Sequence, residues 1–260
     1  MFKRKEHTNN RPPEENTTVP VFTRAVTVGD SEADCRGRIH PGALLRLLQD
    51  AGSEHAEALH IGHELTESKG ALWVIVRTAM EIDRLPRAGE RCAVLTWPGQ
   101  TRRVFMPRSF EMQDAAGAVL LRARSEYLLI SAETRHMLNP DTLGVHIAAV
   151  ERPGELPGPA RRLPFPPDLP ETELRVPRSS ELDVNGHLNN SHYVDWAEDL
   201  LPLDYLRTHA LHSLWVEYRA EVLPDTEVTL RYARDGDTLY LSGQSEKGVH
   251  FTLRAVYGAD

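Results

Sequence analysis

The sequence has only two cysteines, Cys35 and Cys92, among 260 residues. Two thiols cannot form a disulfide framework or a cysteine-based zinc site, and we expect a protein of the reducing cytoplasm. No run approaches the roughly 18 uncharged apolar residues that cross a bilayer, so we expect no membrane span. A net charge of −8 without a long basic stripe disfavours nucleic acid as a partner.

Several catalytic motifs are also absent. The sequence contains no serine-nucleophile elbow, no phosphate-binding glycine loop and no dinucleotide fingerprint. His187 and His192 are five residues apart with no third ligand type nearby, so we expect neither a metal nor a cofactor.

Proline marks the division of the chain. Seven prolines lie between residues 153 and 170, where their fixed φ and missing N–H suit neither a helix nor a central strand. We interpret 153–172 as an extended linker between an N-terminal unit, 21–152, and a C-terminal unit, 173–260. Residues 1–20 are polar and lack the apolar core of a secretory signal, and we expect them to form a disordered tail.

The two units look like copies of one another. Asp34-Cys-Arg-Gly-Arg-Ile-His40 in the first corresponds to Asp183-Val-Asn-Gly-His-Leu-Asn189 in the second, at an offset of 149 residues. Apolar residues at helical spacing follow each segment. They predict helices from Pro41 to about Leu59 and from Ser191 to Leu201.

Strand-like runs separated by turn residues follow each expected helix. In the first unit they are 71–82, 91–97, 103–113 and 118–131, and in the second 214–222, 227–233, 239–245 and 249–257. One helix followed by an antiparallel meander is an α+β unit, in which the helix packs against the concave face of a curved sheet. Two such units in tandem can pair their edge strands into one continuous sheet.

Asp183, Asn185 and His187 bring a carboxylate, an amide and an imidazole together within five residues. If this lead-in to the helix is extended, its period of two places all three side chains on one side, close to the positively polarised helix N-terminus. Such a set can bind a carbonyl and stabilise an oxyanion. Capping and local hydrogen bonding are the alternative role. The first copy carries Arg36 and Arg38 in the same frame, which favours chemistry in the second.

Glu221 is a fourth candidate. Alternation along the expected strand 214–222 places Glu217, Arg219 and Glu221 on one face. A glutamate on a sheet face beneath a helix would be buried and could accept a proton from water. The alternative is an exposed ladder of alternating charges on the surface of the sheet.

These residues resemble the acyl-acyl-carrier-protein (acyl-ACP) thioesterases of plant plastids and bacteria. The motif DVNGHLNNSHYVDWAED followed by WVEYRAEV is similar to the family signature, and WVIVRTAMEIDRLPRAGERCAVLTW with YLLISAETRHMLNP resembles its N-terminal repeat. The resemblance covers residues 20 to 257, and we expect a bacterial member. It implies a tandem double hot-dog fold, each repeat a long central helix packed on a curved antiparallel sheet. It also implies hydrolysis of fatty acyl-ACP to free fatty acid, which ends chain elongation.

Carried over by position, the resemblance implies that Asp183, Asn185, His187 and Glu221 form the catalytic set. Many plant members have a cysteine directly after this glutamate, where the present chain has Val222, so a cysteine mechanism is not available at that position. We expect Glu221 to activate water, and Asn185 with helix N–H groups to hold the oxyanion. His187 would orient water or protonate the leaving thiolate, and Asp183 would fix the Asn185 and His187 side chains. Covalent attack by Asp183 is the rival chemistry.

The resemblance also implies an apolar slot for the acyl chain and acyl carrier protein as an acidic partner. We expect the slot in the first unit, lined by Leu45, Leu48, Ala51, Trp73 and Ile75, and carrier-protein docking at Arg102, Arg103 and Arg108. The chain is expected to be a monomeric pseudo-dimer or a homodimer. A hot-dog thioesterase acting on acyl-coenzyme A and a non-catalytic acyl-thioester sensor remain alternatives.

Overall fold

The computed structural model describes residues 20–156 and 165–259. The expected tail, 1–20, lies outside the described residues except for its last position, and so does the middle of the expected linker. Within the described residues, eleven strands form one sheet in the order β1-β3-β4-β5-β2-β8-β11-β10-β9-β7, with β6 paired to β5. All neighbouring strands run antiparallel.

The described part of the first half has six strands and two α-helices, in the order strand, two helices, then meander. Its elements are β1 (Phe22–Thr27), α1 (Pro41–Ala58), α2 (His63–Ser68), β2 (Ala71–Ile82), β3 (Arg91–Pro98), β4 (Met106–Asp114), β5 (Val119–Ser131) and the short β6 (Met137–Leu138). The second half repeats this order with β7 (Glu171–Arg175), α3 (His192–Asp199), α4 (Leu203–Leu206), β8 (His209–Tyr218), β9 (Val228–Asp235), β10 (Thr238–Ser245) and β11 (Gly248–Ala259). The predicted α+β repeat is therefore confirmed.

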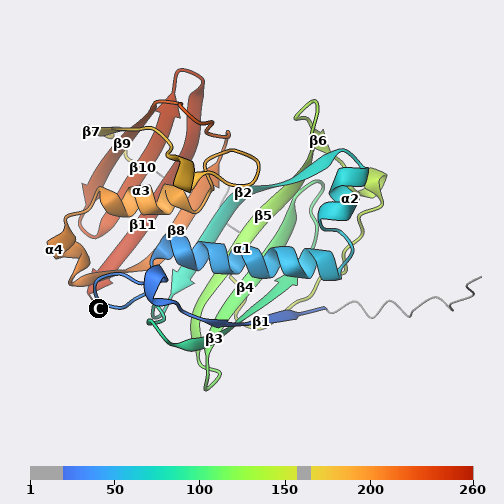
Figure 1. Cartoon of the computed structure of the whole chain (residues 1–260), viewed down its shortest axis with the longest axis horizontal. Helices are drawn as coiled ribbons and strands as arrows, with labels where there is room; N and C mark the ends of the chain where they lie inside the picture. The colour runs from blue at the N-terminus through green and yellow to red at the C-terminus, as the bar shows by residue number, and fades with distance from the viewer. Residues whose placement is uncertain (1–19, 157–164, 260) are drawn as a thin grey trace, which may run out of the picture.

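The two halves join through β2 and β8, which lie side by side in the middle of the sheet (Figure 1). They pair only from Arg77 opposite Glu217 to Glu81 opposite Ser213. Among the described residues, the first part of β2, before Arg77, has no partner on this side because β8 ends at Tyr218. The sheet is continuous, as the sequence predicts, but it opens where these two strands part.

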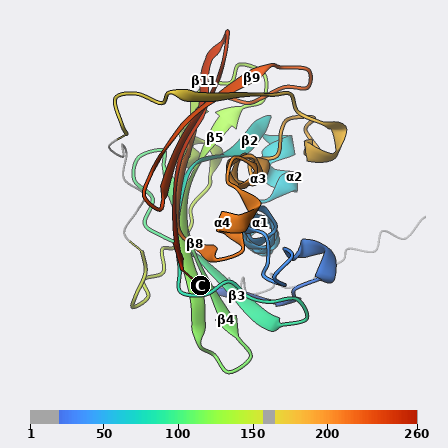
Figure 2. The same cartoon turned by 90° about the vertical axis from the view of Figure 1, so that its left-hand side faces the viewer.

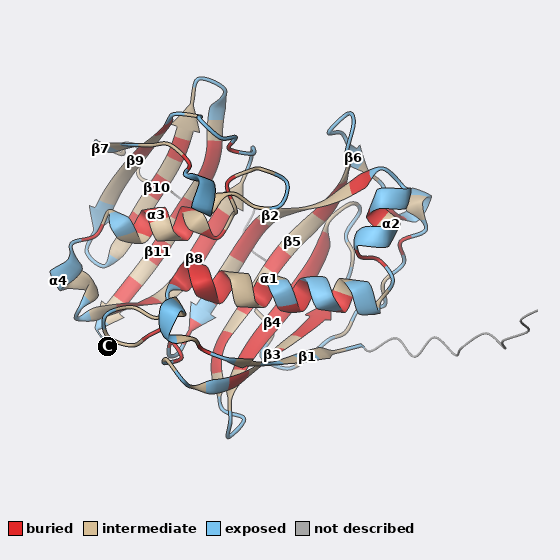
Figure 3. Cartoon of the chain, in the orientation of Figure 1, coloured by how far each residue is buried: buried red, intermediate tan, exposed pale blue. Residues whose placement is uncertain are grey.

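Helices α1, α3 and α4 all lie on one side of the sheet (Figure 2). The buried face of α1 comes from apolar residues spaced three and four apart, such as Leu44, Leu48 and Ala51, which are almost fully inaccessible. Figure 3 shows the start of α1 coloured as buried and the rest of the helix alternating between buried and exposed segments. Complete burial of one leucine side chain contributes about 1.5–3 kcal/mol, so this stripe holds the helix on the sheet. No helix among the described residues is long and apolar enough to cross a membrane.

Several boundaries differ from those expected; β8, for example, begins at His209 rather than at Leu214, and β4 begins at Met106 rather than at Arg103. β8 ends at Tyr218 rather than at Val222, because the N–H groups of Arg219 and Ala220 both donate to His250 O, at 2.8 and 3.1 Å, and the regular ladder stops. The second central helix has eight residues instead of eleven. The N–H groups of Leu200 and Leu201 donate to carbonyl groups three residues earlier rather than four, just before Pro202, so the α-helix stops at Asp199. β7 begins at Glu171, inside the expected linker.

Candidate active site

The loop before α3 is held by a carboxylate that accepts from the backbone. Asp183 Oδ1 accepts hydrogen bonds from the N–H groups of Asn185 at 2.8 Å and His187 at 3.0 Å, and the Asp183 N–H donates to His187 O at 2.7 Å. Gly186 has φ of 75°, which a side chain would strain. Asp183 thus shapes the loop through main-chain contacts, rather than through the Asn185 and His187 side chains as the sequence suggested.

The equivalent loop before α1 repeats this geometry. Asp34 Oδ1 accepts from the N–H groups of Arg36 at 2.8 Å and Arg38 at 2.9 Å, and Gly37 has φ of 72°. The offset of 149 residues therefore holds at the level of individual hydrogen bonds. The side chains differ in use: the Arg38 guanidinium, only 4% exposed, donates to Asp34, to His209 O at 3.0 Å and to Leu206 O at 2.8 Å. The first loop ties the two halves together.

The second loop instead borders a cavity of about 720 Å³ at the place where β2 and β8 part. Asp183, Asn185, His187 and Glu221 all line it, so the structure brings the four expected catalytic residues to one site. Most of the rest of the wall comes from the first half: the second half of α1, the unpaired part of β2, and β4 and β5. The second half adds residues next to its polar loop, at the start of α3 and at the end of β8. One end of the cavity is therefore polar, while apolar strand residues line much of the remainder.

Glu221 is not placed as the sequence predicted. It lies in the segment after β8 rather than on the strand, and its side chain is 41% exposed rather than buried. Its Oε1 lies 3.5 Å from His187 Nδ1 and 3.2 Å from Arg135 Nη1. The expected burial of this carboxylate is wrong. An imidazole and a guanidinium, rather than a low-dielectric surrounding, orient it.

Arg135 comes from the tip of the β5–β6 hairpin, where its φ of 58° is unusual for a residue with a side chain. The hairpin carries the guanidinium from the first half to Glu221 in the second. Arg135 was not predicted from the sequence, because a charged residue in a hairpin has no sequence signal that distinguishes it from ordinary surface. Two tyrosines of the cavity wall, the buried Tyr193 and the half-buried Tyr218, were missed for the opposite reason: their positions are typical of helix and strand core.

The acyl-slot residues divide into two groups. Trp73 and Ile75 line the cavity as expected, and Trp73 Nε1 donates to Ile61 O at 2.8 Å. Leu45, Leu48 and Ala51 do not line it; they are buried in the core between α1 and the sheet. The neighbouring stripe of α1 faces the cavity instead and consists of Gln49, Gly52, Ser53 and Ala56. Sequence periodicity identified the buried stripe correctly but could not tell core from cavity wall.

The prediction that Arg108 contacts the carrier protein is wrong, because its side chain is buried in the wall of the cavity. It occupies an inward position on β4, and its Nη1 lies 2.8 Å from His55 Nδ1 and 3.2 Å from Thr96 Oγ1. Burial lowers the pKa of this guanidinium, and the nearby Tyr127 opposes that shift. Arg102 and Arg103 are exposed in the loop between β3 and β4, where a partner could reach them.

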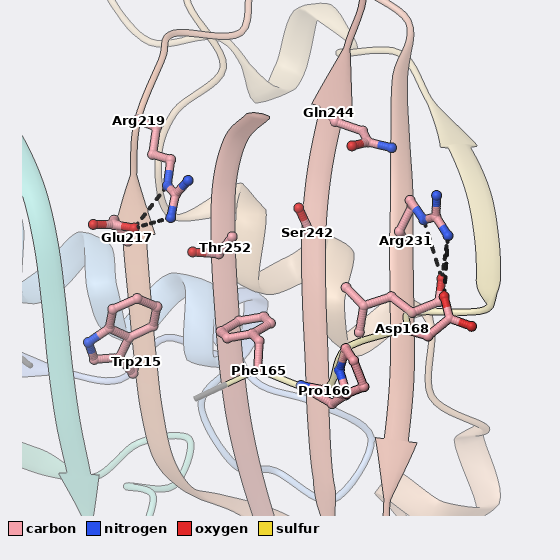
Figure 4. Close-up of a pocket in the computed structure, with 12 residues that line it drawn as sticks. Phe165, Pro166, Asp168, Trp215, Glu217, Arg219, Arg231, Ser242, Gln244 and Thr252 are labelled. Atoms are coloured by element: carbon pink, nitrogen blue, oxygen red, sulfur yellow. Dashed lines mark hydrogen bonds and ion pairs between the residues drawn. The ribbon is translucent and has the colours of Figure 1, made fainter. Parts of the chain in front are cut away.

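A second cavity, of about 580 Å³, lies on the other face of the sheet (Figure 4). The segment 165–169 runs across it, with Phe165 in edge contact with the Trp215 ring at 6.4 Å. Its charged groups are already paired: Glu217 with Arg219 at 2.7 Å, and Arg231 with Leu169 O at 3.2 Å. None of the four expected catalytic residues lines it. We interpret this cavity as the place where the segment 165–169 packs against the sheet.

The cavity between β2 and β8 combines the groups that acyl transfer to water requires. His187 is partly buried and paired to a carboxylate, so the two can pass a proton. Asn185 is exposed beside them, and its amide can donate to an oxygen that gains negative charge. Among the residues that the structure describes, no three histidine, cysteine, aspartate or glutamate side chains are grouped as metal ligands.

Comparisons with known proteins agree with this arrangement. The family descriptions "Acyl-ACP thioesterase N-terminal domain" and "Acyl-ACP thioesterase C-terminal domain" match residues 20–141 and 168–258. A chloroplastic palmitoyl-acyl carrier protein thioesterase from Cuphea hookeriana is 31% identical over 58% of this chain and 38% of its own length. A chloroplastic dodecanoyl-[acyl-carrier-protein] hydrolase from Cinnamomum camphora is 28% identical over 79% of this chain and 57% of its own. This chain thus spans about half the length of these curated relatives, or less.

The fold is also that of a solved structure. The acyl-ACP thioesterase from Bacteroides thetaiotaomicron superposes with a TM-score of 0.81 at 23% identity, covering 92% of this chain and 98% of that one. The architecture described above, two helix-on-sheet repeats in one chain, is therefore a double hot-dog fold.

Proposed function

Because this chain belongs to the acyl-ACP thioesterase family, we propose that it hydrolyses the thioester of fatty acyl-acyl carrier protein, releasing free fatty acid and ending chain elongation. The observation that supports this most directly is the cavity between β2 and β8. Its polar end carries Asp183, Asn185, His187 and Glu221, and its other walls are largely apolar. If the thioester binds at the polar end, its acyl chain would extend along the apolar wall that the first half provides.

In the proposed mechanism, water attacks the thioester carbonyl while Glu221, held by His187, accepts its proton. The carbonyl oxygen becomes an oxyanion, to which the Asn185 amide donates. Glu221 then passes the proton to His187. The carbon–sulfur bond breaks, and the imidazole of His187 protonates the leaving thiolate, which yields acid and thiol. Asp183 keeps the loop in shape through its two backbone hydrogen bonds. Val222 is buried beside Glu221, so the chain offers no thiol nucleophile there.

The acyl chain is proposed to lie against Trp73 and Ile75 and along the α1 stripe that ends at Ala56. Arg102 and Arg103 are the proposed contacts for the acidic carrier protein, because both are exposed in one loop. The two halves already pair within one chain through β2 and β8, as a pseudo-dimer. Cys35 and Cys92 are unpaired, which supports a cytoplasmic location.

The test is thiol release from a panel of acyl-carrier-protein and acyl-coenzyme A substrates, from C8 to C18, saturated and monounsaturated. Rapid turnover of a few carrier-protein esters is the expected result. Faster turnover of the coenzyme A esters would make the protein a general acyl-thioesterase. Tight binding without release would make it a sensor of acyl thioesters.

Variants connect this activity to the site. Glu221→Gln should lower kcat by about 10²-fold or more, because the amide cannot accept the proton from water. Glu246→Gln is the matched control, since Glu246 is exposed at the turn between β10 and β11 and does not line the cavity, so this variant should leave kcat unchanged. Equal rates for both variants would refute the role of Glu221 while leaving the thioesterase activity itself in place.

A further inference from the structure

Tyr193 is a side chain in the wall of this cavity to which the mechanism above gives no role. It is the second residue of α3, it is 3% exposed, and it lines the cavity together with Asp183 and Glu221. Its ring stacks on Phe251 with centroids 4.3 Å apart and lies 5.7 Å from the ring of Tyr218. Close packing on two sides fixes the ring, and a fixed ring fixes the direction of its hydroxyl.

The hydroxyl of Tyr193 makes no hydrogen bond to any residue within 20–156 and 165–259. The ring is buried, but the hydroxyl is not among the fully buried side-chain atoms that lack a partner, so it reaches the cavity, where a ligand can accept its hydrogen bond. Burial raises the pKa of Tyr193 well above its usual value, and the nearby carboxylates of Asp183 and Glu221 raise it further. The phenol therefore stays protonated and can donate a hydrogen bond.

The internal repeat shows that folding alone does not require a hydroxyl here. At the offset of 149 residues, Tyr193 corresponds to Leu44 of α1, which is fully buried in the core. The first copy thus fills this helix position with an aliphatic side chain. Only the copy whose loop faces the cavity has a hydrogen-bond donor at the position, as it also has Asn185 and His187 in place of Arg36 and Arg38.

We propose that the Tyr193 hydroxyl donates a hydrogen bond to the thioester carbonyl oxygen as it becomes an oxyanion, and so acts beside Asn185 as a second donor. This assignment rests on the proposed thioesterase function and adds a catalytic residue to it. A donor directed at developing charge stabilises the transition state more than the bound substrate, so its loss lowers kcat rather than raising KM.

The test compares Tyr193→Phe with Tyr257→Phe. Phenylalanine keeps the stacked ring of Tyr193 and removes only the hydroxyl. Tyr257 is the matched control because it is also 3% exposed with a hydroxyl that has no partner among the described residues, but it does not line the cavity. Tyr193→Phe should lower kcat on acyl-ACP by about 10²–10³-fold with little change in KM, and Tyr257→Phe should keep the wild-type rate. Thermal unfolding of both variants checks that each is folded.

The outcomes separate the two proposals. An active wild type whose Tyr193→Phe variant keeps kcat within about three-fold, or changes KM alone, would overturn the assignment of Tyr193 and leave the thioesterase function intact. A wild type that releases no thiol from any ester would overturn both. A direct readout is the infrared carbonyl band of a ¹³C-labelled thioester bound to Glu221→Gln: adding Tyr193→Phe should move it to higher frequency, and an unmoved band would refute the hydrogen bond.

Discussion

Asp34→Ala should destabilise the protein far more than the equivalent change in the other repeat, Asp183→Ala. The carboxylate of Asp34 accepts from two backbone N–H groups and pairs with the Arg38 guanidinium at 2.7 Å. Asp183 makes the same two backbone contacts, but His187 stands where Arg38 would be. The two variants therefore differ mainly in whether a buried cation loses its partner.

The magnitude follows from this difference. Removing one partner of a buried ion pair costs about 3–5 kcal/mol. The lower end applies here, because Arg38 keeps two carbonyl acceptors and the Asp34 side chain is 20% exposed. Asp183→Ala loses only turn hydrogen bonds, about 1–2 kcal/mol. With about 2–4 °C of Tm per kcal/mol in a domain of this size, Asp34→Ala should lower Tm by about 6–12 °C and Asp183→Ala by about half of that or less.

Urea unfolding followed by circular dichroism measures both free energies of unfolding. Replacing both partners, Asp34→Ala with Arg38→Met, should recover much of the loss, because no cation is then left buried. Similar losses for Asp34→Ala and Asp183→Ala would refute the argument, as would a double variant no more stable than Asp34→Ala alone.

The same pair gives a pH dependence. Burial by itself would raise the pKa of Asp34, but the hydrogen bonds from Arg38 and Arg36 outweigh it and hold the pKa below its usual value. Stability from a lowered carboxyl pKa is present above the unfolded pKa and is lost as the pH falls through the folded pKa. The stabilities of wild type and Asp34→Ala should therefore converge in acid, and a difference that stays constant would contradict the ion-pair explanation.

Three further changes probe the cavity and its support. Arg135→Ala removes a half-exposed pair with Glu221 and should lower kcat/KM by no more than about five-fold, since such pairs contribute under about 1 kcal/mol; a larger loss in acyl-ACP turnover would mean that Arg135 contacts substrate. Gly243→Ala would place its Cβ in steric conflict with the buried Phe251 ring and should lower the free energy of unfolding in urea by about 1–3 kcal/mol, and an unchanged midpoint would show that the ring can move aside. Arg108→Met removes a buried guanidinium from the cavity wall and should move chain-length preference towards longer acyl chains in competition assays; an unchanged preference would place the acyl chain away from this wall.

The two central helices and the four strands that follow each of them could be predicted from the sequence because they have local signals, whereas β1, β7 and the short helices α2 and α4 were not predicted. The apolar residues of α1 have helical spacing, the strands alternate with a period of two, and turn residues separate them. The repeat of Asp34 at Asp183 shows which residues of the two halves correspond. The end of β8 could not be predicted. It depends on two N–H groups, of Arg219 and Ala220, meeting the single carbonyl of His250, a residue about thirty positions away.

The site was predicted as a set of residues but not as a geometry. Sequence spacing placed Asp183, Asn185 and His187 together, because they share one loop. It placed Glu221 on a buried strand face, where the structure has an exposed segment. Arg108 was assigned to the surface because charge usually lies there. Only the tertiary structure shows that its strand turns this side chain into a cavity.

The asymmetry between the repeats explains why both halves are needed for one site. Arg38 donates hydrogen bonds from the loop of the first half to two carbonyl groups of the second half. This position of the first copy therefore has a structural contact where the second copy has His187. The second copy keeps its polar cluster, but most of the cavity wall belongs to the first half. Gln49 of α1 connects the two halves at the cavity, because its Nε2 donates to Asn190 Oδ1 at 2.7 Å, next to the polar loop. In the proposed function, one repeat thus supplies the polar groups and the other most of the surface for the acyl chain, so we expect neither repeat to be active alone.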